Sequence, residues 1–277
     1  MKKLSIILLL ISIFYKANAK NTTDSYRKTM TASYNNISVD VIVDKPSNDD
    51  LDVLVLFHGT VLYDENILTA ANKTLDKFKA ILDRKDMLLI SVAYPEENMI
   101  LGDNIKQAEA ALLWIKYKAS QELGIQVKKI FMAGHSQGGY IVTRLNTMHT
   151  TNGVIANAPG PLNLVYRCEL EEKGKIKQSI NCTKLRNTYG STDSNPEAYM
   201  QRSLLNFTSG FKSDILFVQG LKDSPIQLYS WPAFKQKILN CKDCQKTVFA
   251  EIPEGEHTSL FTSQLAQLEF NNFINQR

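Results

Sequence analysis

A serine stands among glycines in the sequence Gly-His-Ser-Gln-Gly-Gly at residues 134–139. An apolar run at 129–133 precedes this segment, and residues 140–145 can continue as a helix. The order of strand, tight turn and helix predicts a nucleophile elbow, in which glycines permit close packing and strained backbone exposes the Oγ of Ser136. The backbone N–H of Gln137 would then face a negative charge developing on a substrate. The alternative is an ordinary structural turn, because glycine and serine are common in turns.

A serine hydroxyl needs a base within hydrogen-bond reach before it attacks, and the base needs an orienting carboxylate. His257 is the candidate base, because it lies between the expected last strand, 248–252, and the expected last helix, 258–274. The loop joining them should lie at the carboxyl edge of the sheet. The other three histidines are less suitably placed: His58, His135 and His149.

Asp223 is the candidate acid, because it lies in the loop after the expected strand 215–218. Three other aspartates are expected to be solvated surface carboxylates: Asp193, Asp214 and Asp243. In the order Ser136, Asp223, His257, each residue follows its own strand. This order predicts a catalytic triad.

A second donor for a developing oxyanion is expected after the buried strand 53–57. The sequence Phe-His-Gly-Thr at 57–60 follows this strand, and the backbone N–H of Thr60 would complete an oxyanion hole with that of Gln137. The alternative is a plain strand-to-loop turn, with His58 hydrogen-bonded internally.

Apolar runs alternate with helical patterns along most of the chain. Strands are expected at 53–57, 87–92, 130–133, 154–156, 215–218 and 248–252, and helices at 66–83, 103–121 and 258–274. This alternation predicts one α/β domain with a mostly parallel sheet covered by helices on both faces. In such sheets the functional residues gather at the carboxyl ends of the strands.

Residues 160–208 interrupt this alternation. They contain Pro161, a charged run at 169–173, several turn formers and two of the four cysteines. We expect a cap over the site, and the alternative is a surface loop held by a disulfide.

The cysteines are Cys168, Cys182, Cys241 and Cys244. An even number in an exported chain predicts disulfides, and of the three possible pairings the two local ones, 168–182 and 241–244, are favoured. The Cys-x-x-Cys spacing at 241–244 would also suit a redox or metal site. No thioredoxin-like context and no second such motif accompany it, so neither a metal nor a cofactor is expected.

The first 19 residues have the pattern of a secretory signal peptide. Two lysines precede an apolar run over 4–14, and small residues at 17 and 19 place the cleavage site after Ala19. The alternative, a membrane anchor, would need about 20 apolar residues. A secreted or periplasmic protein comprising residues 20–277 is therefore expected, with no stable membrane insertion.

The charge of the chain argues against nucleic acid as a partner. The net charge is +4, and cleavage would remove three lysines and no acid, leaving 29 basic and 28 acidic residues. No stretch is dense in lysine and arginine, so we expect a small-molecule or acyl-ester substrate and no nucleic acid.

From about Asn36 to its C-terminus the chain resembles the α/β-hydrolase superfamily. The matching motifs are His58–Thr60, 134–139, 220–223 and 255–257. The variant Gly-His-Ser-Gln-Gly-Gly is similar to those of small esterases, lipase-like enzymes and prolyl-oligopeptidase-like hydrolases. The chain lacks the His-Gly-Gly-Gly run of one large esterase group, so that group is not expected. We also expect no propeller domain before the motifs, which argues against a true oligopeptidase.

The resemblance implies a serine hydrolase. We expect an exported carboxylic-ester hydrolase that forms an acyl-enzyme on Ser136. An amidase or peptidase with the same triad is the nearest alternative, and a secreted binding protein without turnover is another.

Overall fold

The computed structural model describes residues 24–277, so the expected signal peptide, residues 1–19, lies outside the described residues. Within that range, eight strands form one sheet in the order β1-β2-β4-β3-β5-β6-β7-β8. Their bounds are β1 (Tyr26–Tyr34), β2 (Ile37–Lys45), β3 (Asp50–Phe57), β4 (Leu88–Ala93), β5 (Gln126–His135), β6 (Gly153–Asn157), β7 (Ile215–Gly220) and β8 (Thr247–Ile252).

The sheet is mostly parallel. β1 and β2 form an antiparallel hairpin and β2 pairs antiparallel with β4, whereas every pairing from β4 to β8 is parallel. Parallel strands need crossover connections, and helices supply them here. The expectation of a mostly parallel α/β sheet is therefore confirmed.

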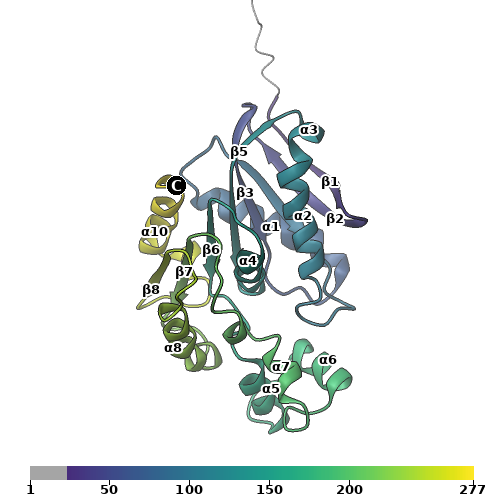
Figure 1. Ribbon diagram of the computed structural model, residues 1–277, viewed down its shortest axis with the longest axis vertical. Coiled ribbons are helices and arrows are strands. Elements are labelled where there is room, and N and C mark those ends of the chain that lie inside the picture. The colour runs from purple at the N-terminus through teal and green to yellow at the C-terminus, as the bar shows by residue number, and fades with distance from the viewer. Residues whose placement is uncertain (1–23) are drawn as a thin grey trace, which may run out of the picture.

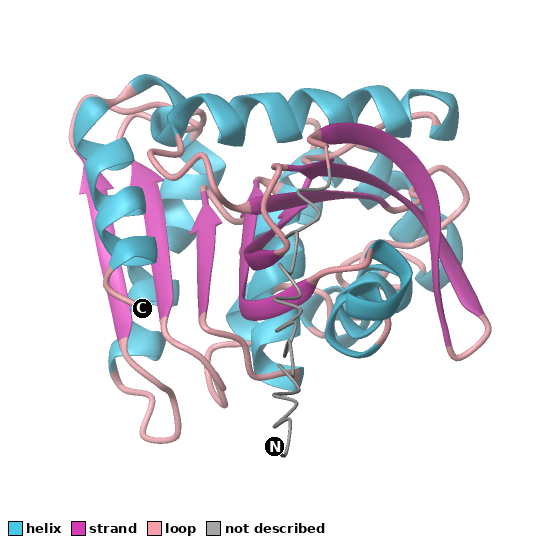
Figure 2. Ribbon diagram, turned by 90° about the horizontal axis from the view of Figure 1, so that it is seen from above, coloured by secondary structure: helices cyan, strands magenta, loops and turns pink. Residues whose placement is uncertain are grey.

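Helices cover both faces of the sheet (Figure 2). One face packs against α2 (Ile105–Tyr117), α4 (Gln137–Met148) and α8 (Pro225–Leu239). The other packs against α1 (Ile67–Ile81), α9 (Ser259–Thr262) and α10 (Gln264–Asn275). Two short 3₁₀ turns lie at Asp64–Asn66 and Leu204–Asn206.

The apolar run of β3 explains the two cores. Side chains alternate along a strand, so Val55 and Phe57 enter the core under α2 and α4, while Leu54 and Leu56 enter the core under α1. All four are fully buried. Burial on both faces is what an uninterrupted apolar strand requires.

The 160–208 segment contains three helices, α5 (Leu164–Glu172), α6 (Ile180–Tyr189) and α7 (Pro196–Met200). They lie together beyond one edge of the sheet, at the bottom of Figure 1. Each begins at a residue whose side chain accepts a backbone N–H: Asn163, Ser179 and Asn195. The helices share a small core of their own, which includes both cysteines of the segment.

Three helical features differ from expectation. The helix expected at 103–121 ends at Tyr117, because the backbone of Lys118 leaves the helical region and α3 (Ala119–Leu123) starts anew. The last helix is divided at Ser263, whose hydroxyl caps α10. Helix α8 was not expected, and it contains Pro232. Among residues 24–277, no helix has the length and apolar character needed to cross a membrane.

Candidate active site

Ser136 lies in the turn between β5 and α4 with backbone angles φ 57° and ψ −117°, a strained conformation for a residue with a side chain. Close packing around the turn requires glycine. A Cβ on Gly134 would lie 2.1 Å from the carbonyl oxygen of Gly138, and a Cβ on Gly138 would lie 2.0 Å from that of Phe57. The strand–turn–helix arrangement expected around Ser136 is therefore present.

Asp223 and His257 lie in the loops that follow β7 and β8. The Nδ1 of His257 donates a hydrogen bond of 2.8 Å to the Oδ2 of Asp223. Asp223 is buried, and it also accepts hydrogen bonds from the Gln219 side chain (3.0 Å) and from the backbone N–H of Ser224 (2.6 Å). Burial raises the pKa of Asp223, but these donors outweigh it and keep the pKa below its usual value.

One cavity of about 930 Å³ brings these side chains together. Ser136, Asp223 and His257 all line it, together with Thr60. The 160–208 segment also forms a large part of the wall, with contributions from α5 and from the start of α6. The three residues expected to form a triad thus face the same space.

Thr60 and Gln137 contact each other directly. The hydroxyl of Thr60 donates to the side-chain oxygen of Gln137 at 2.8 Å. The preceding glycine lies against the serine, since a Cβ on Gly59 would be 3.5 Å from the Cβ of Ser136. The loop expected to supply an oxyanion donor therefore adjoins Ser136.

His58 is buried beneath this loop. Its Nδ1 lies 2.7 Å from the carbonyl oxygen of Gly59, and its ring stacks on Tyr94 at a centroid distance of 4.0 Å. Burial lowers the pKa of His58 to about 4, so the ring is neutral near pH 7. His58 is thus hydrogen-bonded internally, as the alternative interpretation of residues 57–60 expected.

Glu96 is a residue of this region that the sequence did not single out. Its Oε2 accepts the backbone N–H of Val61 at 3.0 Å, next to Thr60. Burial raises its pKa from 4.5 to about 8, and the hydrogen bond from Val61 offsets part of this effect. Its place in the sequence could have identified it, because Glu96 follows β4 and thus lies at the same edge of the sheet as Ser136.

His135 lies behind the candidate base. Its Nδ1 is 2.8 Å from the side-chain nitrogen of Asn157, and its ring centroid is 4.9 Å from that of His257. Burial, reinforced by the positive charge His257 can carry, lowers the pKa of His135 to about 3. His135 therefore stays neutral and cannot replace His257 as a proton acceptor near neutral pH.

The other candidates lie away from these residues. Asp214 forms an ion pair of 2.9 Å with Arg277, and His149 lies 2.6 Å from a carboxylate oxygen of Glu109. Asp193 is exposed, and so is Asp243, which lies beside Cys241. None of the three aspartates lines the cavity.

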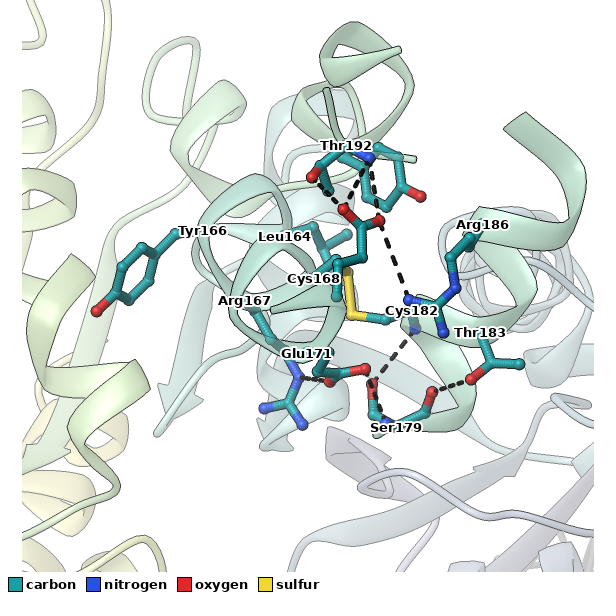
Figure 3. The surroundings of a disulfide bond; sticks show 12 residues. Leu164, Tyr166, Arg167, Cys168, Glu171, Ser179, Cys182, Thr183, Arg186 and Thr192 are labelled. Atoms are coloured by element: carbon teal, nitrogen blue, oxygen red, sulfur yellow. Dashed lines mark hydrogen bonds and ion pairs between the residues drawn. A yellow bond between two sulfur atoms is a disulfide. The ribbon is translucent and has the colours of Figure 1, made fainter. Parts of the chain in front are cut away.

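The cysteines form the two local pairs that the sequence favoured, Cys168–Cys182 and Cys241–Cys244. The first joins α5 to α6 inside the 160–208 segment (Figure 3). Buried Glu171 lies close by and connects the same two helices, as it accepts from Arg167 and from the backbone N–H of Ser179. The second lies between α8 and β8.

No protein-family model matches this chain, and no curated protein matches its sequence. Solved structures do match it. A truncated carbohydrate esterase from gut microbiota gives a TM-score of 0.68 at 16% identity, over 91% of this chain and 97% of the esterase. An esterase from Pyrobaculum calidifontis gives a TM-score of 0.65 at 13% identity, over 92% of this chain and 85% of the esterase.

An acylaminoacyl peptidase from Pyrococcus horikoshii gives a TM-score of 0.65 at 14% identity. The match covers 91% of this chain but only 42% of the peptidase, so the chain spans less than half of that protein's length. Together with the sheet topology, these matches show that the fold is that of the α/β hydrolases.

Proposed function

We propose that this protein is a serine hydrolase that cleaves carboxylic esters through an acyl-enzyme on Ser136. The observation that carries the proposal is the shared cavity, in which Ser136 faces the hydrogen-bonded pair of Asp223 and His257. A nucleophile, a base and an orienting carboxylate are the groups that acyl transfer needs. The esterase neighbours support the same reaction class.

The hydrogen bond from Nδ1 to Asp223 fixes the tautomer of His257 and leaves Nε2 free to accept a proton. In the proposed reaction, Ser136 Oγ attacks the carbonyl carbon while His257 takes the hydroxyl proton. His257 then gives this proton to the leaving alcohol as the ester bond breaks. A water, activated by the same base, releases the acid and regenerates Ser136.

The negative charge that forms on the carbonyl oxygen requires hydrogen-bond donors. The backbone N–H groups of Gln137 and Thr60 are the proposed pair. Gln137 is the first residue of α4, so the partial positive charge of the helix N-terminus adds to its N–H. The Thr60–Gln137 side-chain hydrogen bond fixes the two donors relative to each other.

The 160–208 segment is proposed to act as a cap that shapes the substrate cavity, since α5 and α6 line the same cavity as Ser136. Export to the periplasm or the medium is also proposed. Both disulfides support export, because paired cysteines persist in oxidising compartments.

Kinetics with a panel of p-nitrophenyl esters and peptide anilides test the proposal. Wild type should hydrolyse esters faster than anilides. Ser136→Ala should lose turnover by about 10³-fold or more while its circular dichroism spectrum stays unchanged. The peptidase neighbour makes anilide hydrolysis the second candidate activity, and a preference for anilides would favour it. Retention of more than about a tenth of wild-type kcat would contradict a serine hydrolase.

A further inference from the structure

The charged side chains that line the cavity come from two parts of the chain, the 160–208 segment and the loops after β7 and β8. The 160–208 segment contributes Arg167 and Lys177, both basic. The loops after β7 and β8 contribute the acids Asp223 and Glu256. Lys222 also lies in these loops, where it forms an ion pair with Glu254. The 160–208 segment therefore contributes two basic side chains and no acidic one to the cavity, and Arg167 pairs with Glu171 through its Nε alone.

Arg167 is held in a defined orientation. Its Nε donates to the Oε1 of Glu171 at 3.1 Å, and Glu171 is itself buried and fixed by the backbone N–H of Ser179 at 2.9 Å. Figure 3 shows the two terminal nitrogens of Arg167 directed away from Glu171. Within residues 24–277, neither terminal nitrogen has a hydrogen-bond acceptor.

A guanidinium whose Nε is occupied and whose two terminal nitrogens are free can bind both oxygens of a carboxylate. The side chain is 31% exposed, so its open end is accessible from the cavity. Lys177 lines the same cavity and has no ion pair among the described residues. The starts of α5 and α6 line the cavity too and add partial positive charge.

We propose that Arg167, assisted by Lys177, binds an anionic group at the end of the substrate remote from the ester bond, with a carboxylate as the best fit. The inference rests on the proposed function, because it assumes that the ester bond lies at Ser136. It assigns the substrates to a class, esters that carry a free acid on the acyl or the alcohol portion. Arg167 is then a specificity-determining residue.

The test compares esters that differ only in charge. One series is the p-nitrophenyl monoesters of dicarboxylic acids of four to eight carbons, each beside its neutral methyl ester. A second pair places the charge on the leaving group, as 4-acetoxybenzoate beside its methyl ester. Wild type should favour the charged member in at least one series, by about 10-fold in kcat/KM.

Arg167→Gln should lower this charged-to-neutral ratio by about 10-fold, because kcat/KM for the charged ester should fall more than that for its neutral ester. Lys177→Gln should lower the ratio less. Lys173→Gln is the matched control, because Lys173 is an exposed base at the end of α5 that pairs with Glu169 and does not line the cavity. It removes the same charge and should leave the ratio as in wild type.

A wild type without preference for the charged member in either series would overturn the inference, as would an unchanged ratio in both Arg167→Gln and Lys177→Gln. If Arg167→Gln misfolds, the charged-to-neutral ratio of Lys177→Gln tests the inference instead. This variant should fold, because Lys177 is exposed and has no ion pair among the described residues. Calorimetric binding of the charged and neutral esters to Ser136→Ala tests the anion site without turnover. Loss of neutral-ester hydrolysis in Ser136→Ala separately tests the proposed function.

Discussion

The Oδ2 of Asp223 lies 2.8 Å from the Nδ1 of His257, although 34 positions separate them in the chain. The sheet explains this contact. β7 and β8 are parallel neighbours whose last residues, Gly220 and Ile252, are paired in register. The loops that follow therefore leave the same edge side by side. A Cβ on Gly220 would lie 2.3 Å from the carbonyl oxygens of Gly255 and Glu256, so the two loops pack directly against each other.

Asp223→Asn should lower kcat for ester hydrolysis by about 10³- to 10⁴-fold, because an amide no longer selects the His257 tautomer that accepts the serine proton. Asp193→Asn and Asp243→Asn are controls, as both aspartates are exposed and lie outside the cavity. Steady-state kinetics on one p-nitrophenyl ester compares all three. A large loss in either control, with Asp223→Asn active, would assign the acid elsewhere.

Gly220→Ala should lower kcat by about 10-fold or more, because the added Cβ would displace the loop that carries His257. Gly124→Ala is the control. Gly124 has a positive φ of 64° but no atom within 4 Å of an added Cβ, so this change should cost about 1 kcal/mol of stability and leave kcat unchanged. Thermal melts and kinetics on both variants separate the two effects. Full activity of Gly220→Ala would show that the loop position is not critical.

Glu96→Gln should change how stability depends on pH. The pKa of Glu96 is raised from 4.5 to about 8 by burial, so the folded protein keeps a proton that the unfolded chain releases above pH 4.5. The stability contributed by this carboxyl is fully present below pH 4.5 and is lost as the pH rises to about 8. The difference in Tm, variant minus wild type, should therefore increase from pH 5 to pH 8.

Comparison with wild type at each pH cancels the contributions of other groups, such as His58. Glu97→Gln is the control, because Glu97 is the half-buried neighbour of Glu96 and the change removes the same carboxyl group. The rise in the Tm difference from pH 5 to pH 8 should be larger for Glu96→Gln than for this control. A flat difference for Glu96→Gln would mean that Glu96 is ionised in the folded protein near pH 7.

Replacement of Cys168 and Cys182 by serine should alter the ratio of kcat/KM between a long and a short acyl ester. The disulfide closes a loop of 14 residues between α5 and α6, whose starts line the cavity. The same replacement of Cys241 and Cys244 is the control, because that pair lies outside the cavity. Whether or not the segment acts as a cap, loss of the Cys168–Cys182 cross-link should cost about 2–4 kcal/mol of stability. A lower Tm with an unchanged ratio would leave the 160–208 segment as a surface element only.

The central strands were predictable because burial on both faces demands uninterrupted apolar runs such as that of β3. The order of the candidate triad followed from placing one polar residue after each such strand. Helix α8 was not expected, and it contains Pro232, a residue type that disfavours a helix interior. Tertiary packing overrides this preference: Trp231 and Phe234 of α8 both pack against Phe217 of β7.

The sequence indicated the helices of the 160–208 segment and the burial of Glu96 less clearly. α5 and α6 bury few residues, and the segment depends on local caps and on one disulfide, so its pattern resembles that of a loop. Glu96 stands in the polar sequence Pro-Glu-Glu, which is typical of an exposed turn. Its burial follows from the way the loop after β3 folds over it, and this contact joins residues 35 positions apart.

Labelling with a fluorophosphonate probe, followed by peptide mass spectrometry, tests most directly whether Ser136 is the nucleophile. Ser179→Ala is the matched control, because Ser179 is another serine that lines the cavity. We expect one adduct, on Ser136, in wild type and in Ser179→Ala, and none in Ser136→Ala. Labelling of Ser136→Ala to the wild-type extent, or an adduct on another residue in wild type, would contradict this expectation.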